Sequence, residues 1–194
     1  MREEIIRMLL KNQDDYLSGE EIARRLGISR AGVWKHIDVL KKMGCEIECK
    51  QNKGYRLVRI PDILAPEILC AWDFSKTLEC VEVLHYDQCT STNDVAKQLA
   101  QKGKKGPCVI VAEQQTAGRG RLNRPWTSSA GEGVYLSILL RPEISLFDMP
   151  KMSLIAGVAV SRAIEKVASV HPKVKWPNDV LIDSRKVCGI LSEM

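Results

Sequence analysis

The sequence predicts an α+β protein of two modules, in which a small helical unit ending in a β-hairpin precedes a larger unit with a mixed sheet. Three observations predict it. Apolar residues recur with helical spacing as far as Met43 and then alternate as in a strand. From residue 81 onward, strand patterns and helix patterns are mixed. The two modules also differ in net charge. Residues 1–60 hold 13 Lys and Arg against 9 Asp and Glu, whereas residues 61–194 hold 16 Lys and Arg against 15 Asp and Glu.

Length and composition exclude several classes of protein. The chain has 194 residues, of which 45% are hydrophobic and 27% charged, so it can bury a core and is neither disordered nor fibrous. No apolar run approaches the roughly 18 residues of a membrane-spanning helix. The first residues are charged and helical in pattern, unlike a signal peptide. We therefore expect a cytoplasmic protein with no membrane partner.

The cysteines support a reducing compartment. Seven are present, an odd number with no Cys-x-x-Cys pair, and we expect them to be buried small apolar residues rather than disulfides. They are Cys45, Cys49, Cys70, Cys80, Cys89, Cys108 and Cys188.

The first module carries signals for three helices. An amphipathic helix comes first. Ser18 and Glu21 then form a capping box that begins a second helix, which ends at Gly27. Ser29 caps a third helix, and Gly44 ends it as a C-terminal glycine does. The apolar positions expected in the core are Ile5, Ile6, Leu9, Leu10, Ile22, Ala23, Leu26, Val33, Ile37, Val39, Leu40 and Met43.

A β-hairpin follows the third helix. Cys45, Ile47 and Cys49 alternate with polar residues, residues 51–54 supply turn chemistry, and residues 55–57 return as a second strand. A short helix, a glycine turn, a capped helix and a hairpin are the parts of a winged helix-turn-helix. Such units place the start of the third helix in the major groove of DNA. The expected DNA-binding residues are Ser29, Arg30, Trp34, Lys35, His36 and Lys53.

Two alternatives stay open for this module. The basic face is also compatible with a helical interaction module whose charges are merely solvated. Trp34 is compatible either with a contact in the DNA groove or with half-buried packing.

The second module begins after a linker at residues 61–80, where Pro61 and Pro66 favour a short extended connection. The helix after the first strand should be capped by Ser91, and the last hairpin should turn at Ser184 and Arg185. Expected strands cover residues 81–86, 108–113, 134–141, 174–176, 180–183 and 187–193. Expected helices cover residues 91–102 and 149–168, and the pattern of the second is amphipathic to buried.

The loop at residues 114–133 is the first candidate site. So long a loop in a compact domain is expected to be functional, and to become ordered when a ligand binds. Its glycines let the backbone approach a ligand, its arginines suit a carboxylate or phosphate, and its tryptophan can stack on a planar ring. Taken alone, it is also compatible with a basic linker or a nucleic-acid contact. The residues are Gly118, Arg119, Gly120, Arg121, Arg124 and Trp126.

A second polar cluster lies at a strand end. Residues 175–179 read Lys-Trp-Pro-Asn-Asp, and Lys186 follows the next hairpin. Cations around an aspartate suggest a polyphosphate and its magnesium ion, with Asp179 as the metal ligand. Considered singly, Asp179 is more often a turn residue, and Trp176 is more often a core residue.

These segments resemble the signature segments of biotin protein ligases, and the preceding winged helix resembles the bifunctional kind that also represses the biotin operon. The resemblance extends over essentially all of the chain and implies a catalytic domain similar to class II aminoacyl-tRNA synthetases at residues 81–194, behind a DNA-binding domain at residues 1–60. The matching residues are Ser91-Thr92-Asn93, Gly118-Arg119-Gly120-Arg121-x-x-Arg124-x-Trp126, Lys175-Trp176-Pro177-Asn178-Asp179 and Lys186-x-x-Gly189-Ile190-Leu191.

The resemblance implies an ATP-dependent enzyme and a repressor. It would join biotin to ATP, with Mg²⁺, to give biotinyl-5′-AMP and pyrophosphate, and would then biotinylate a lysine of the biotin carboxyl carrier protein of acetyl-CoA carboxylase. The adenylate would also be a corepressor that promotes homodimer formation and binding to the operator DNA of biotin-synthesis genes.

The same resemblance implies a role for each matching residue. The implied catalytic residues are Arg119, Arg121, Lys175 and Lys186. The implied biotin-binding residues are Ser91, Thr92, Asn93, Gln115, Gly118, Arg119, Gly120, Arg121, Lys186 and Gly189. The implied ATP- and adenylate-binding residues are Arg121, Arg124, Trp126, Lys175, Asn178 and Asp179, with Asp179 also holding Mg²⁺.

The sequence departs from the family pattern in two ways. Asn123 stands where many members have glycine, and asparagine tolerates the left-handed conformation that a glycine there would adopt. The chain also stops at Met194, so we expect its catalytic domain to be incomplete at the C-terminus, without a further stretch and a small β-barrel. Two other functions remain open: a winged-helix regulator that senses biotin or a related acid without catalysis, and a ligase for lipoate or another acid.

Overall fold

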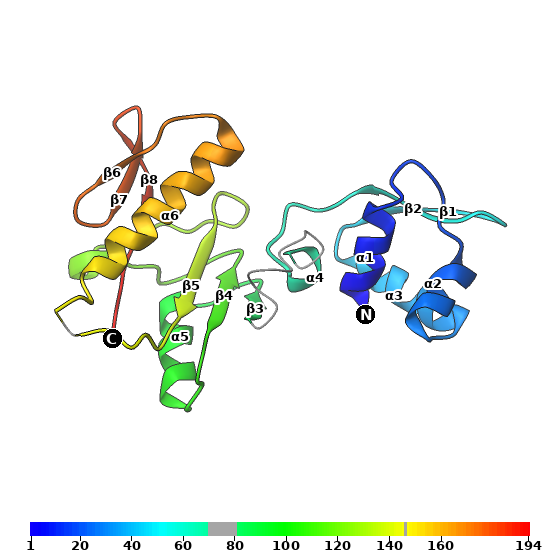
Figure 1. The fold of residues 1–194 in the computed structure, drawn as a ribbon, viewed down its shortest axis with the longest axis horizontal. Coiled ribbons are helices and arrows are strands. Elements are labelled where there is room, and N and C mark those ends of the chain that lie inside the picture. The colour runs from blue at the N-terminus through cyan, green and yellow to red at the C-terminus, as the bar shows by residue number, and fades with distance from the viewer. Residues whose placement is uncertain (70–80, 146) are drawn as a thin grey trace.

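The structure, a computed structural model, describes residues 1–69, 81–145 and 147–194. Figure 1 shows the first module at one end of the molecule, the second module at the other, and α4 between them. In chain order the elements are α1 (Arg2–Leu10), α2 (Gly19–Leu26), α3 (Arg30–Lys42), β1 (Glu46–Lys50), β2 (Gly54–Arg59), α4 (Pro66–Leu69), β3 (Glu82–Tyr86), α5 (Thr92–Gln101), β4 (Cys108–Ala112), a 3₁₀ turn (Arg121–Asn123), β5 (Tyr135–Leu139), α6 (Lys151–Ala168), β6 (Lys173–Lys175), β7 (Asp179–Ile182) and β8 (Arg185–Gly189).

The expected caps of the first module are confirmed. Ser18 Oγ accepts a hydrogen bond from the Glu21 amide at 3.1 Å, and Ser29 Oγ accepts one from the Gly32 amide at 3.1 Å. Each serine thereby satisfies a helix-terminal N–H group that has no partner within its helix. Gly27 ends α2 in the left-handed conformation, with φ at 66°.

Gly44 ends α3 as predicted. Its φ is 96°, its amide donates to the carbonyl of Lys41 at 2.9 Å, and the amide of Cys45 donates to the carbonyl of Leu40 at 3.0 Å. These two hydrogen bonds form a Schellman motif, which satisfies carbonyls at the helix end. The helix therefore stops where β1 must begin.

The core of the first module is the one expected, with a single exception among the expected positions. Val39 is half-buried and lies outside the cluster of buried side chains. Ala65 and Ile68 extend this core beyond the hairpin. The fully buried large side chains of the module are Ile5, Ile6, Leu9, Ile22, Val33 and Leu40.

The hairpin is fastened to the loop before α2. Leu17 and Tyr55 exchange two backbone hydrogen bonds of 2.9 Å each. Only glycine fits at position 54, because its φ is 118° and a Cβ there would lie 2.1 Å from the carbonyl oxygen of Leu17. The wing is thus held in a fixed place relative to the helices.

The prediction that every cysteine is buried is wrong for Cys49, which is exposed. The tip of the hairpin projects past the helices in Figure 1, so alternate side chains near it have no core to pack on. Cys45 and Cys108 are buried, whereas Cys89 and Cys188 are half-buried. Cys70 and Cys80 lie outside the described residues.

The connection between the modules is not simply extended. Pro66 is the first residue of the short helix α4, a position that suits proline because the first helical N–H has no partner within the helix. Glu67 of α4 forms an ion pair with Arg2 at 3.0 Å. The part of the expected linker at residues 70–80 lies outside the described residues.

The described strands of the second module form two sheets. In the first, β3 pairs with β4 in parallel and β4 pairs with β5 antiparallel, which confirms a mixed sheet. The central strand β4 is the most buried, and α5 packs on β4 and β5. In the second sheet, β6, β7 and β8 are all antiparallel and lie next to α6.

Three details differ from expectation. Helix α6 packs on β6 and β7 through Gly157, its one buried residue, and its opposite face is open, with Ile155 60% exposed. Strand β8 ends at Gly189 rather than at residue 193. The last hairpin turns at Asp183 and Ser184, whose positive φ values of 48° and 64° are those of a tight two-residue turn.

Within the described ranges, none of the helices combines the length and the apolar character that crossing a membrane requires.

Candidate active site

The parallel pairing of β3 and β4 creates the site. Because the two strands run in the same direction, their C-terminal residues Tyr86 and Ala112 are neighbours, and the segments that follow them meet. Cys89, after β3, pairs with Gln115, after β4, in an isolated bridge. The start of α5 and the base of the long loop therefore lie side by side.

The side-chain amide of Gln115 joins these segments. Its Oε1 accepts hydrogen bonds from the Thr92 amide at 2.8 Å and from Thr92 Oγ1 at 3.2 Å. Its Nε2 donates to Ser128 Oγ at 3.0 Å, and its backbone amide donates to the Ser128 carbonyl at 3.1 Å. One residue thus connects α5 with both ends of the loop.

The expected cap of α5 is therefore wrong in its acceptor. Ser91 is the residue at the N-cap position, but its side chain accepts no capping hydrogen bond, and it is buried. Gln115 accepts from the Thr92 amide instead. Strand β5 adds Ser137, whose Oγ lies 2.8 Å from Thr92 Oγ1 and also contacts Asn93 Oδ1. This places three of the four predicted polar pocket residues in one connected network.

The loop itself forms a narrow hairpin. The amide of Trp126 donates to the carbonyl of Gly118 at 2.9 Å, and the amide of Gly120 donates to the carbonyl of Arg124 at 2.8 Å. At the tip, Asn123 adopts a φ of 56°, which confirms the left-handed conformation expected for it. Leu122 adopts a φ of 58° and is 85% exposed, a feature that nothing in the sequence indicated.

The two glycines of the loop differ in what surrounds them. A Cβ at Gly118 would lie 2.7 Å from the Trp126 carbonyl oxygen and 2.8 Å from Ser128 Oγ, so position 118 needs glycine for the hairpin to close. A Cβ at Gly120 would meet nothing nearer than the Arg124 carbonyl oxygen at 3.8 Å. Only the first glycine is required by the protein's own packing.

Arg119 is paired with carboxylates of the protein. Its two terminal nitrogens donate to Asp94 at 2.9 and 2.6 Å, and one of them also lies 3.2 Å from Glu193 Oε2. The hydrogen bond from Arg119 lowers the pKa of the Asp94 carboxyl, and the bond to Asp94 raises the pKa of Arg119. Neither carboxylate was predicted as part of the site.

The other two arginines of the loop are free. Arg121 and Arg124 are exposed, and the guanidinium of neither has a hydrogen bond or ion pair with any described residue. The predicted arginine cluster is therefore divided, with one guanidinium held by the protein and two open to an anion.

The second cluster lies on the sheet of β6, β7 and β8. Lys175 pairs with Asp179, and Asp179 pairs with Gly189, so three predicted site residues form one row across the strands. Lys186 Nζ lies 2.7 Å from Asp179 Oδ1 in an ion pair. This oxygen is buried and has no hydrogen bond of good geometry within the described chain, so the contact is an ion pair by distance only.

Trp126 joins the two clusters. Lys186 Nζ lies 5.0 Å from the centre of the Trp126 ring, a cation–π contact. A Cβ at Gly189 would lie 3.0 Å from the ring and 3.1 Å from Lys186 Cε, so glycine at 189 lets ring and lysine approach. The loop hairpin thereby reaches the row on the second sheet.

The remaining residues of this cluster differ in their contacts and in their exposure to solvent. The side-chain Nδ2 of Asn178 donates to the Ile190 carbonyl at 3.0 Å, and the Asn178 backbone carbonyl accepts from the Ile190 amide at 2.8 Å. These two hydrogen bonds fix the chain just after β8. Lys175 is exposed. Trp176 is 76% exposed, so interpreting it as a core residue is wrong.

The site offers cations for an anionic ligand and polar groups for its neutral part. Arg121, Arg124, Lys175 and Lys186 supply positive charge, while Gln115 and its partners supply a small buried polar network. Within the described ranges, no three His, Cys, Asp or Glu side chains gather as a metal cluster. Asp179, with its buried Oδ1, is the one predicted metal ligand.

Most of the predicted DNA-binding residues of the first module are exposed. Ser29, Arg30, Lys35 and Lys53 are exposed, and Trp34 is 60% exposed, which favours a contact surface over packing. His36, the remaining one, is half-buried.

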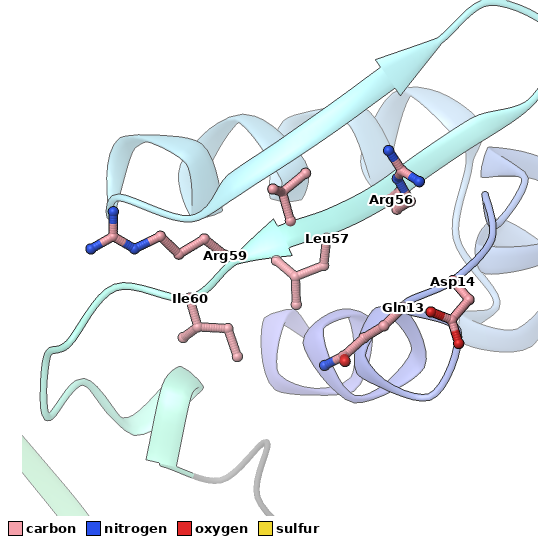
Figure 2. A pocket seen from close by; sticks show the side chains of 7 residues that line it. Gln13, Asp14, Arg56, Leu57, Arg59 and Ile60 are labelled. Carbon is pink, nitrogen blue, oxygen red and sulfur yellow. The ribbon is translucent and has the colours of Figure 1, made fainter.

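The first module also contains a hollow of about 360 Å³ beside β2 and the end of α1, shown in Figure 2. Its lining side chains include Gln13, Asp14 and Arg56, and none of the predicted site residues. Arg56 there is already paired with Glu48 at 2.8 Å. The chemistry of the protein therefore points to the loop and not to this hollow.

Comparison with known protein families identifies the second module. The model of the biotin/lipoate A/B protein ligase family matches residues 85–194, more than half of the chain. The chain belongs to this family. A model described as an HTH domain matches residues 2–56, so the helix-turn-helix unit and the ligase-type domain behind it are both confirmed.

Relatives named as bifunctional ligase/repressors match nearly the whole chain. The bifunctional ligase/repressor BirA of Bacillus subtilis (strain 168) is 39% identical over 194 residues, which are 100% of this chain and 59% of that protein. BirA of Escherichia coli (strain K12) is 34% identical over 180 residues, 93% of this chain and 54% of that protein. The chain thus spans little more than half the length of these relatives.

Solved structures of family members resemble the second module. Biotin protein ligase from Aquifex aeolicus, in complex with biotin and ATP, is 34% identical with a TM-score of 0.52 over 58% of this chain and 47% of that chain. The enzyme from Leishmania major, in complex with biotinyl-5-AMP, is 30% identical with a TM-score of 0.51 over 57% of this chain and 51% of that chain.

The geometry around the loop glycines predicts an unequal response to substitution. Gly118→Ala should open the loop hairpin, because the clash with the Trp126 carbonyl costs on the order of 2 kcal/mol. Trypsin cleavage after the loop arginines in the ligand-free protein should then accelerate at least roughly tenfold. Gly120→Ala is the matched control and should leave the cleavage rate unchanged. Equal rates for the two variants would contradict this account of the loop.

Proposed function

We propose that the protein is an ATP-dependent biotin protein ligase and a DNA-binding repressor of biotin-synthesis genes. The reaction would join the carboxylate of biotin to the α-phosphate of ATP, release pyrophosphate, and then acylate a lysine of a biotin carboxyl carrier protein with release of AMP. The biotinyl-5′-AMP intermediate would also serve as corepressor. Membership of the ligase family and relatives named as bifunctional ligase/repressors support both roles.

The observation that carries the proposal is the contact of the loop hairpin with the row on the second sheet. Through Trp126, the loop hairpin that carries Arg121 and Arg124 contacts Lys186, which is paired with Asp179. A carboxylate that attacks a phosphate brings two negative charges together, and preorganised cations lower the cost of that approach. Cations on two separate elements, joined by a stacking ring, suit this step.

We assign the parts of the site accordingly. Thr92, Asn93, Gln115 and the buried Ser91 would line the biotin pocket, where a largely apolar ligand needs a few placed hydrogen bonds. The glycines at 118, 120 and 189 would allow close approach of the ligand. The cations that would act on the carboxylate–phosphate junction are Arg119, Arg121, Lys175 and Lys186.

The nucleotide would lie on the side of Trp126, with Arg124 and Asn178 nearby. Magnesium is usually held by one or two protein carboxylates together with substrate phosphates and water. The single carboxylate of Asp179, with its buried oxygen, fits that donor set and would be the protein ligand of the ion. The ion would neutralise phosphate charge, and Lys186 would keep the carboxylate paired in its absence.

The first module would bind operator DNA. The start of α3 would lie in the major groove, with the exposed Arg30, Trp34 and Lys35 toward the DNA and Lys53 on the wing. Helix-turn-helix proteins usually bind two half-sites as a dimer, so we propose that the adenylate-bound protein forms a homodimer. ATP, the carrier protein and DNA are all found in the cytoplasm, where the protein would act.

A test of catalysis uses Lys186. Lys186→Ala should slow adenylate formation by about 10²-fold, because it removes one preorganised cation from the developing charge. The measurement is pyrophosphate release with biotin, ATP and Mg²⁺, and Lys104→Ala, which loses only an ion pair to Glu82, is the matched control. A rate for Lys186→Ala within about twofold of the unsubstituted protein would contradict the assigned role.

The same assay decides between the alternatives. Biotin binding without pyrophosphate release from the unsubstituted protein would favour a sensor that does not catalyse. Turnover with lipoate or octanoate in place of biotin would favour a ligase for another acid. Binding of none of these acids, measured by calorimetry, would contradict the proposal as a whole.

A second test concerns DNA. Affinity for a biotin-operon promoter should fall steeply with salt, and Lys35→Ala should reduce the slope of log affinity against log salt by about one, because one phosphate contact is lost. Lys166→Ala, on α6 of the second module, is the control. Binding that does not depend on salt, or an unchanged slope for Lys35→Ala, would contradict the assigned DNA surface.

A further inference from the structure

We propose that Asp94 is a positioning residue of the ligase site, which holds the guanidinium of Arg119 in the orientation that the substrate meets. The proposal rests on the function proposed above. It adds a second carboxylate to a site in which Asp179 was the one carboxylate that the sequence indicated.

The geometry of the pair supports an orienting role. Asp94 binds the guanidinium end-on, with Oδ2 at 2.9 Å from one terminal nitrogen and Oδ1 at 2.6 Å from the other. A guanidinium has five N–H groups, of which this pair uses two and Glu193 a third. The Nε–H and one terminal N–H therefore remain for a ligand. A bidentate pair also fixes the plane of the guanidinium, which a single hydrogen bond does not.

Asp94 belongs to the helix turn that organises the rest of the site. Thr92, Asn93 and Asp94 are consecutive residues at the start of α5, and they contact Gln115, Ser137 and Arg119 respectively. The same rigid turn therefore places the polar pocket and the first arginine of the loop. The positive end of the helix dipole favours the carboxylate in this position.

The pair is sheltered enough to hold its geometry. The side chain of Arg119 is 22% exposed and that of Asp94 is 31% exposed. A long arginine side chain left unpaired would have to lose rotamer freedom each time a ligand bound. Because the pair orders Arg119 beforehand, that loss does not recur at each binding event.

Glu193 acts as a second and weaker anchor. Its carboxylate is shared among Arg119, Lys97 and Asn93, with Lys97 at 2.6 Å and Asn93 at 2.9 Å. Burial raises the pKa of Glu193, but the hydrogen bonds from Lys97 and Asn93 outweigh that effect and lower it. Because the contact with Asp94 is closer and bidentate, Asp94 is the main determinant of the orientation of the Arg119 guanidinium.

A double-mutant cycle tests the proposal. The variants are Asp94→Asn, Arg119→Gln and both together, and the readouts are biotin affinity by calorimetry and kcat and KM from pyrophosphate release. Asp94→Asn should weaken biotin binding roughly tenfold, as expected when one charged hydrogen-bonding group loses its orientation. In the Arg119→Gln background it should have no further effect, because Asp94 acts only through Arg119. Asp94→Glu, which keeps the charge, should restore part of the affinity.

The matched control is Glu82→Gln, which breaks an ion pair with Lys104 in the same module but outside the loop. It should leave affinity and turnover unchanged. Additive effects of Asp94→Asn and Arg119→Gln would overturn the proposal, since they would mean that Asp94 acts independently. Tighter biotin binding by Asp94→Asn would also overturn it, since the pair would then withhold Arg119 from the ligand.

A ligand-free readout separates this proposal from the proposed function. In ¹⁵N nuclear magnetic resonance spectra, the Nε–H signal of Arg119 should be sharp in the unsubstituted protein and broadened in Asp94→Asn, while circular dichroism confirms the fold. An unchanged signal would overturn the positioning role whether or not biotin binds. A failure of the unsubstituted protein to bind biotin would instead count against the proposed function.

Discussion

Gln115 holds the base of the loop through both ends of its side-chain amide, and the candidate site depends on this arrangement. The oxygen accepts from Thr92 at the start of α5, and the nitrogen donates to Ser128 at the far end of the loop. A carboxylate could not donate and a lysine could not accept, whereas an amide offers an acceptor oxygen and a donor nitrogen at separate atoms. With both strands of the loop base fixed, the hairpin between them presents its cations in a defined place.

The balance of charge in the second module follows from this geometry. The net charge of the module is close to zero, but its cations fall into two groups, one paired with carboxylates and one exposed. Arg119 is compensated by Asp94 and Glu193, whereas Arg121 and Arg124 at the exposed hairpin have no carboxylate partner among the described residues. A protein that must bind an anion can neutralise the cations that fix its structure while leaving others open. The charge therefore gathers locally without a large net excess.

Local signals in the sequence predicted much of the fold. The caps at Ser18 and Ser29 and the glycine at 44 depend only on neighbouring residues, and the structure confirms them. Contacts between distant segments were not predictable in this way. No local pattern in the sequence marked Asp94 or Ser137 as part of the site. Asp94 matters because the parallel pairing of β3 and β4 brings the start of α5 and the loop together, and Ser137 matters because β5 pairs with β4 and contacts α5.

Amide hydrogen exchange of the ligand-free protein, with Gln115 intact and with Gln115→Ala, tests the central claim most directly. The account predicts that the amides of Thr92 and Trp126 are protected in the unsubstituted protein, and that both lose protection when the side-chain amide is removed. Thr92 loses its acceptor directly, and Trp126 loses the closed hairpin that its hydrogen bond to Gly118 requires. Unchanged protection at Trp126 in Gln115→Ala would contradict the claim that this one amide organises the loop.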